Sequence, residues 1–453
     1  MRYNSVTCAG LNKDLPVTEC IQTKLEFPPL KARKVEAEFA GGDVTSDGGV
    51  LLLRNIDKKL GLLENVNRAI PDPRDTRYIE HSQLSLLRQR VYALCQGYED
   101  LNDHTELRVD PAIQTAVDRD EVLGSASTLC RLENRVSRKS AVDIHEILLN
   151  QFMNSFDSPP EELILDFDAT DDRVHGEQMQ RFFHGYYGDY CFLPLYVFCG
   201  DQLLVSYLRP SNIDGAKHSW AILALLTKQL RKKWPNVKII FRGDSGFCRW
   251  KMLRWCDRHQ VDYIVGIAKN ARLKAKIATL ITDAEKLYKE TGTKARLFDD
   301  IHYKAGAWDK PRRVIAKAEH MSQGSNPRFI VTSLKGDARS LYEKLYCARG
   351  DMENRIKEQQ LGLFADRTSC HDWWANQFRL LLSSLAYVLL ESIRRLALSG
   401  TELSKAQVTT VRLKLLKVGA VIIQNTRRIR FLLSSAFPYQ KLFADVAQAL
   451  KPG

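Results

Sequence analysis

Three acidic residues stand where a folded chain can use them for chemistry. Asp168 lies at the end of the apolar run LILDFD, Asp244 lies in RGDSGF directly after another apolar run, and Glu353 lies in the charged segment YCARGDMENRIKEQQ. An aspartate at the end of an apolar strand is costly to bury unless it is paired or bound to a metal. Each residue alone also has an ordinary explanation, as a turn aspartate or as half of an ion pair on a helix surface. The chemistry therefore depends on whether the three converge.

Convergence of three carboxylates would create repulsion that divalent cations relieve. Mg²⁺ prefers oxygen ligands, and two such ions can activate the attacking oxygen and stabilise the leaving oxygen of a phosphoryl transfer. The sequence therefore predicts a site for two Mg²⁺ ions, with Asp168, Asp244 and Glu353 as catalytic residues and metal ligands. In a basic protein, such a site fits cleavage or transfer of a DNA phosphodiester.

Asp166 competes with Asp168 for the first of these positions. Side chains alternate along a strand, so the two aspartates share a face and lie roughly 7 Å apart, too far to be equivalent ligands of one ion. Asp168 is nearer the strand end, and we assign it to the metals. Asp166 is expected to lie deeper, hydrogen-bonded behind the first ligand.

The charge of the chain indicates a polyanionic partner. The 453 residues carry a formal net charge of +13, and 44% are hydrophobic and 27% charged, as in a globular protein. Residues 376–453 contain 12 Lys/Arg against 3 Asp/Glu. A basic surplus in one segment is typical of nucleic-acid binding, although basic tails also occur in proteins that bind none.

The pattern of elements predicts an α/β protein with a mixed sheet flanked by helices. Pro159 and Pro160 end a helical region, and strand-like runs alternate with helices after them. The predicted divisions begin with a poorly structured N-terminus at 1–35 and a mainly helical DNA-binding region at 36–158. The catalytic core follows in two parts, 159–269 and the Glu353 helix at 341–374, separated by a β-rich insertion at 270–340. A basic, mainly helical C-terminal region occupies 375–453.

Two groups of basic residues are candidates for DNA contact. Arg131, Arg135 and Arg138 follow Ser/Thr capping candidates at i, i+4 and i+7, which suggests the second helix of a helix-turn-helix; a solvated arginine face explains the same spacing. Tyr346, Arg349 and Glu353 fall on one stripe of a predicted helix, together with Gln360. An amphipathic helix with an Arg349–Glu353 surface pair is the plain alternative.

These motifs, taken in order, resemble the DDE transposases of bacterial insertion sequences. DAT at 168–170 resembles the first catalytic motif and DSGF at 244–247 the second, while Tyr346, Arg349 and Glu353 match the signature Y-x2-R-x3-E-x6-K. The signature lysine is replaced by Gln360, and Lys357, one turn earlier, can take over its phosphate contact. GYYGDYCFLPLYVFCGDQLL, RGDSGFCR and SSLAYVLLE further resemble the insertion-sequence family numbered thirteen-eighty. The resemblance spans about residues 35–445.

The resemblance implies the rest of the expected activity. It implies an RNase H-like core using two Mg²⁺ or Mn²⁺ ions, binding of terminal inverted repeats, cleavage at the element ends and joining to target DNA. It also implies a homodimer on paired ends in the bacterial cytoplasm, associated with the nucleoid. Some relatives with a β-rich insertion stack a flipped base on a tryptophan there. Trp308 is the candidate, and packing beneath a hairpin is the alternative for it.

Two other functions are compatible with the sequence. A metal-dependent nuclease would cut DNA without joining it, because water and a DNA hydroxyl attack phosphorus in the same geometry. A non-catalytic DNA-binding regulator would not need the three carboxylates. His175 can touch DNA or can serve as a turn residue. The N-terminus shows no signal peptide, and the longest apolar run, residues 380–390, is too short to cross a bilayer.

Overall fold

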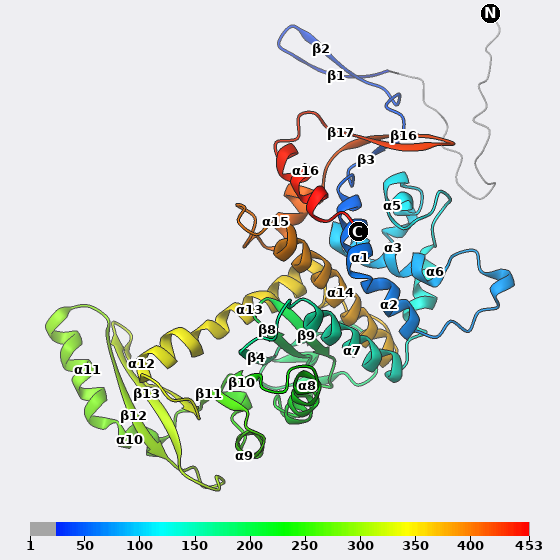
Figure 1. Ribbon diagram of the computed structural model, residues 1–453. Helices are drawn as coiled ribbons and strands as arrows, with labels where there is room; N and C mark the ends of the chain where they lie inside the picture. The colour runs from blue at the N-terminus through cyan, green and yellow to red at the C-terminus, as the bar shows by residue number, and fades with distance from the viewer. Residues whose placement is uncertain (1–23, 453) are drawn as a thin grey trace, which may run out of the picture.

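The computed structural model describes residues 24–452 (Figure 1). Most of the segment expected to be poorly structured, residues 1–23, lies outside the described residues. The remainder of that segment corrects the expectation, because it begins a two-stranded antiparallel hairpin formed by β1, Leu25–Leu30, and β2, Arg33–Ala37. Both strands are exposed along their whole length, and the hairpin extends away from the body of the molecule (Figure 1).

Helices dominate the chain from residue 50 to residue 154. A single apolar core joins them to the long helix near the C-terminus, α14, Trp373–Ala397. Glycine and serine residues define several of their ends; for example, Ser82 caps the helix that begins at Gln83 by accepting a hydrogen bond from the Ser85 backbone. The helices are α1 Val50–Leu60, α2 Leu62–Ala69, α3 Gln83–Gln96, α4 His104–Leu107, α5 Pro111–Ala116, α6 Ala126–Glu133 and α7 Arg138–Asn154.

A mixed sheet forms the centre of the molecule, as the sequence predicts. Its central strands lie in the order β11-β10-β4-β8-β9; β4 pairs with β10 and β10 with β11 in parallel, whereas β4–β8 and β8–β9 are antiparallel. The long apolar run YCFLPLYVFCG divides at Pro194, because proline cannot donate to a ladder. The strands are β4 Glu162–Ala169, β8 Leu195–Cys199, β9 Gln202–Tyr207, β10 Lys238–Gly243 and β11 Asp262–Ile267.

Helices cover both faces of this sheet. On one face, Leu165 and Phe167 share a core with α8, Ser219–Lys233, and α9, Trp250–Arg258. On the other face, Tyr196 and Phe198 share a core with α14 and with α13, Gly350–Lys357. The alternation along β4 sends Asp166 and Asp168 to the second face, beneath α13.

The expected β-rich insertion continues the core sheet. Strand β15, Arg328–Thr332, pairs with β11, and β13, Arg312–Met321, and β12, Ala295–Tyr303, extend the same sheet outward. Figure 1 shows this extension as an arm covered by α11. The remaining elements are β14 Gly324–Ser325, α10 Ala271–Lys276, α11 Ala278–Thr291 and α12 Ala338–Ser340.

The C-terminal region returns to the N-terminal half. It includes a basic antiparallel hairpin formed by β16, Ala420–Asn425, and β17, Arg428–Leu433, and β16 pairs with β3, Val44–Thr45. Helix α15, Val408–Val411, precedes the hairpin, and helix α16, Gln440–Ala449, follows it. Within residues 24–452, no helix has the length and apolar character needed to cross a membrane.

Candidate active site

Asp168 and Asp244 lie side by side at the ends of neighbouring parallel strands. The register pairs Phe167 of β4 with Gly243 of β10, so the next residues along both strands are the two aspartates. Adjacent strands are separated by about 4.8 Å. Asp244 also caps the short 3-10 turn Ser245–Phe247 by accepting a hydrogen bond of 2.8 Å from the Gly246 backbone. The sheet therefore brings together two residues that lie 76 positions apart.

Glu353 reaches the same place from α13. Buried Met352 and Ile356 hold this helix against the core, and Glu353 lies about a quarter turn away from this buried stripe. Arg349, one turn earlier, bridges the helix and the sheet: its guanidinium lies 3.2 Å from an Asp168 oxygen and 2.5 Å from a Glu353 oxygen. The Arg349–Glu353 pair expected from the spacing is present, but it is joined to the strand-end aspartate as well.

The electrostatics of this cluster agree with its geometry. Burial raises the pKa of Asp168 to about 6; Arg349 opposes that rise, and the nearby carboxylates of Asp244 and Glu353 add to it. Burial lowers the pKa of Arg349, but Asp168 and Glu353 outweigh that effect and raise it. Three carboxylates thus face a single arginine.

Asp166 occupies a different environment. Its side chain is 3% exposed and pairs with Arg242, its register partner on β10, through both carboxylate oxygens. Arg242 also donates to the Leu345 carbonyl at 2.5 Å. Burial raises the pKa of Asp166, and Arg242 opposes that rise. Because both oxygens of Asp166 are occupied, the geometry agrees with its predicted place behind Asp168.

Tyr346 packs at the other side of the cluster. Its hydroxyl lies against Gly266 of β11, where an added Cβ atom would stand 2.6 Å from that oxygen and 2.8 Å from the Ser245 backbone nitrogen. Only glycine fits this approach of helix to strand. A cavity of about 100 Å³ opens beside it and is lined by Ser245, Lys269, Arg328, Tyr342 and Tyr346, among others.

The helix that carries the signature residues is irregular. Leu341–Tyr346 and Glu358–Gly362 are π-helical, with a 3-10 turn at Cys347–Arg349 and regular α-helix only in α13. π-turns are often found at functional sites. The second π-turn changes the register after Lys357, which is exposed at the end of α13. Gln360 donates to the Asp171 carbonyl at 3.0 Å.

The three carboxylates have the donor chemistry that Mg²⁺ requires. Oxygen ligands, mutual repulsion and partial exposure suit a hard divalent cation. Glu353 is 44% exposed and Asp168 16% exposed, so both remain accessible from one side. No group of three His, Cys, Asp or Glu side chains within residues 24–452 is gathered tightly enough to form a ready-made metal centre. Arg349 stands between two of the candidate ligands.

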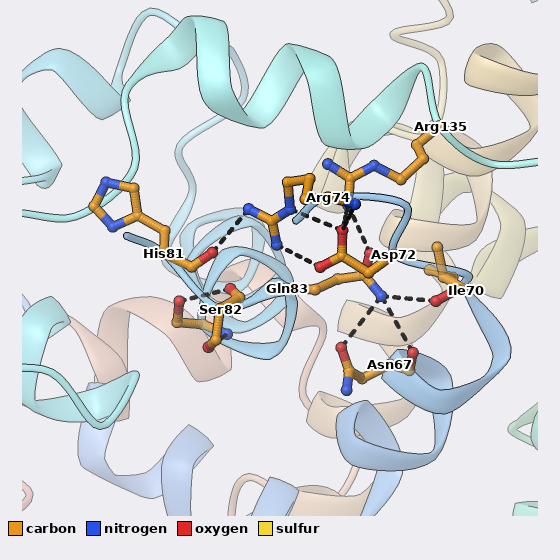
Figure 2. A network of polar contacts seen from close by, with 9 residues as sticks. Asn67, Ile70, Asp72, Arg74, His81, Ser82, Gln83 and Arg135 are labelled. Carbon is orange, nitrogen blue, oxygen red and sulfur yellow. Dashed lines mark hydrogen bonds and ion pairs between the residues drawn. The ribbon is translucent and has the colours of Figure 1, made fainter. Parts of the chain in front are cut away.

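The predicted arginine face at 131–138 is wrong. Helix α6 ends at Glu133, and Ser137 caps the start of α7 by accepting a hydrogen bond from Ser140, so the arginines do not share one helix. Figure 2 shows Arg135 engaged within the protein, where it contacts Asp72 and Gln83, both at 2.9 Å. These contacts account for Arg135 without DNA. Arg131 is exposed, and its DNA contact stays a prediction.

Trp308 is placed by the structure in the interior. It is 6% exposed, its ring packs edge-on against Tyr303 at 5.7 Å, and Arg312 lies over it at 5.8 Å. The geometry therefore favours packing over base stacking, because no ring face is free. His175 is exposed and lines a groove of about 240 Å³ with Gln360, Arg173 and Arg367. Contact between His175 and DNA stays a prediction.

Two features near the site were missed by the sequence reasoning. Arg242 lies in FRGDSGF, two residues before Asp244, just as Asp166 lies two residues before Asp168. This equal spacing on two strands was the signal that the arginine and the aspartate could pair. The second feature is the segment RFFHGYYGDY, residues 181–190, which inserts between β4 and β8. Its density of aromatic residues and glycines was visible in the sequence.

Comparisons with known proteins identify the family of this chain. The model of the family described as Transposase DDE domain group 1 matches residues 27–452, nearly the whole chain. The chain therefore belongs to this family, and it is a DDE-type DNA transposase. A cryo-EM structure of a piggyBac transposase synaptic complex with hairpin DNA is similar over 90% of this chain and 86% of that chain, with 10% identity and a TM-score of 0.42. No curated protein matches the chain.

Proposed function

We propose that this transposase binds the terminal inverted repeats of an insertion sequence, cleaves the DNA at the element ends and joins the ends to target DNA. The observation that carries the proposal is the convergence of Asp168, Asp244 and Glu353 on one face of the sheet, around Arg349. The order β9-β8-β4-β10-β11, with three antiparallel-linked strands followed by two parallel ones, supports an RNase H-like core.

Asp168, Asp244 and Glu353 would hold two Mg²⁺ ions, or Mn²⁺ in their place. When bound, such ions lower the charge on the phosphate and favour attack by an oxygen nucleophile. The chain itself supplies position. The sheet sets the separation of the two aspartates, α13 brings the glutamate over them, and Asp166–Arg242 holds β4 and β10 in register beneath them.

Arg349 has two roles in this proposal. Without DNA, it neutralises Asp168 and Glu353. With DNA and metal present, the ions would take over that neutralisation, and the guanidinium would turn to a phosphate oxygen near the scissile bond. Tyr346, at the adjacent cavity, and Lys357, exposed at the end of α13, would hold the same strand. The charge of +13 favours DNA in general.

Membership of the thirteen-eighty insertion-sequence family, a bacterial cytoplasmic location and a homodimer on paired ends remain part of the proposal. Family membership rests on the stretches GYYGDYCFLPLYVFCGDQLL, RGDSGFCR and SSLAYVLLE, and the location and the homodimer are what this resemblance implies.

A reaction with separate readouts for cutting and joining tests the proposal. Purified protein, Mg²⁺ and linear DNA carrying the candidate inverted repeats are incubated with a supercoiled plasmid. Cleaved ends and end–plasmid products are then separated on gels. Both products are expected, and DNA of scrambled end sequence is the control. Cleavage without any joined product would instead identify a nuclease that lacks strand transfer.

A further inference from the structure

The aromatic hairpin, defined as residues 181–190, is a separate structure at the edge of the site. Strands β6, Phe182–His184, and β7, Asp189–Phe192, pair with each other, and β7 also pairs with β5, Asp172–Arg173. Gly188 makes the turn possible, with φ of +71° and a backbone hydrogen bond of 2.8 Å to the His184 carbonyl. The turn presents Tyr186 at its tip.

The hairpin leaves several aromatic rings in solvent. Tyr186 is 86% exposed and Phe183 58% exposed, and Phe182 and Tyr190 are also exposed. The rings hold one another in place: Phe183 meets Tyr190 edge-on at 5.7 Å, and Tyr186 meets Tyr187 edge-on at 5.0 Å. Such a concentration of exposed rings is unfavourable in water and is typical of a binding surface.

The hairpin lies next to the catalytic carboxylates. Strand β5, which pairs with β7 of the hairpin, begins four residues after Asp168. Tyr187 is half-buried toward this side; burial raises its pKa to about 12, and the nearby carboxylates of Asp171 and Asp168 add to the rise. A groove of about 240 Å³ is lined by Asp171 and Arg173, beside β5, and by Gln360, which follows the catalytic helix.

The local charge identifies which part of DNA the hairpin suits. Arg181 lies over the Tyr190 ring at 5.0 Å, and Arg173 is exposed, but Asp171, Asp189 and Glu177 lie close to these arginines. The surface thus carries both positive and negative charges, so it is poorly suited to bind the phosphates of a DNA backbone. Aromatic faces, in contrast, bind bases, and they bind them only when the bases are outside the duplex stack.

We infer that the aromatic hairpin stacks unpaired bases at the DNA end beside the cleavage site. Tyr186 and Phe183 supply the ring faces, and Arg181 supports the neighbouring ring. The inference rests on the proposed function for its choice of DNA as the partner. It assigns to residues 181–190 the base-stacking role that buried Trp308 has no free face to perform.

Binding without cleavage tests the inference. The full-length protein in EDTA is titrated with a fluorescein-labelled blunt duplex and with the same duplex carrying an unpaired tail of a few nucleotides. The wild type is expected to bind the tailed DNA more tightly, and Tyr186→Ala is expected to reduce this preference roughly 5- to 150-fold, the range for one stacked base. Tyr186→Phe and Tyr186→Trp keep a ring face and should retain it.

The controls separate stacking from loss of folding. Tyr78→Ala removes an equally exposed tyrosine elsewhere and should leave the ratio of tailed to blunt affinity unchanged. Tyr186→Ala should keep the wild-type melting temperature, and Phe183→Ala provides a second variant. A 2-aminopurine in the tail should lose fluorescence on binding to the wild type and keep it with Tyr186→Ala.

Two results would overturn the inference. One is an equal affinity for tailed and blunt DNA in the wild type. The other is a Tyr186→Ala protein that retains the tail preference but has a lower mass than the wild type in light scattering, which would make the hairpin a contact between two copies of the chain. A protein that prefers tails yet never cleaves with Mg²⁺ would refute the proposed function and leave the hairpin's role standing.

Discussion

Two arginine–carboxylate clusters lie two residues apart on β4, and they differ in almost every physical respect. In the inner cluster, Arg242 and Asp166 come from paired positions on neighbouring strands, both are buried, and each oxygen of Asp166 has a partner. In the outer cluster, Arg349 serves Asp168 and Glu353 at once, both partly exposed, with Asp244 alongside.

The difference shows that two aspartates on one strand can serve different purposes, one in stabilising the sheet and the other at the reaction site. A buried pair with matched charges is satisfied within the protein, and it holds two strands in register. A cluster with three carboxylates and one arginine has excess negative charge, and it remains open to an added cation. Variants of the outer cluster should therefore change catalysis, and variants of the inner cluster should change stability.

The largest effect is expected from the outer carboxylates. Asp168→Asn or Glu353→Gln should reduce strand cleavage to background in both Mg²⁺ and Mn²⁺, because each change removes the charge of a proposed metal ligand. Binding of DNA ends should persist, since affinity comes mainly from basic residues. Gel assays of labelled ends, filter binding and thermal melts measure the three quantities. Asp351→Asn, an exposed change on the same helix, is the matched control. Near-normal cleavage by Glu353→Gln would contradict the site.

The inner cluster should respond in the opposite way. Asp166→Ala should lower the free energy of unfolding by about 3–5 kcal/mol, because it leaves Arg242 buried without its partner. Urea unfolding measures this loss. Replacing both members, as in Asp166→Leu with Arg242→Met, should recover much of it. The milder Asp166→Asn should retain measurable cleavage. If Asp166→Asn were inactive while Asp168→Asn cleaved DNA, the roles of the two aspartates would be reversed.

The same contrast extends to aromatic residues. Trp308→Ala should lower the free energy of unfolding by about 3–5 kcal/mol, because the buried ring leaves a cavity. Distortion of the terminal bases, followed by permanganate reactivity, should not change. Tyr186→Ala should show the opposite pattern, in which the free energy of unfolding is unchanged and the distortion of the terminal bases is reduced. Normal stability of Trp308→Ala combined with loss of end distortion would restore the stacking role of this tryptophan.

A smaller effect is expected when an arginine is replaced conservatively. Arg349→Lys should reduce joining about tenfold, because a lysine cannot hold two carboxylates, or two phosphate oxygens, as the planar guanidinium does. Arg242→Lys should leave joining largely intact and lower the melting temperature instead. The two variants are compared in one joining assay and one melt. Wild-type joining by Arg349→Lys would reduce that residue to a surface ion pair.

Much of the sheet, and the positions of the proposed catalytic carboxylates on it, could be predicted locally. The apolar runs ending at Asp168 and Gly243, and the amphipathic spacing around Glu353, specify strands and a helix through short-range preferences. The helix at 373–397 and the basic hairpin at 420–433 follow from equally clear patterns. Predictions failed where a helix boundary depended on capping. Ser137 caps the start of α7, so Arg131 and Arg138 belong to different helices and do not share a face.

What the sequence determined by itself is the set of residue types and their positions on strands and helices, because periodicity and turn chemistry act over a few residues. Only the tertiary structure decided which of these residues meet. The parallel register of β4 and β10 places Asp244 beside Asp168 and gives Arg242 to Asp166. The packing of Tyr346 on Gly266 sets α13 over both. The fold also buries Trp308 and exposes Tyr186, because the exposure of a side chain depends on the whole fold and not on the residue type.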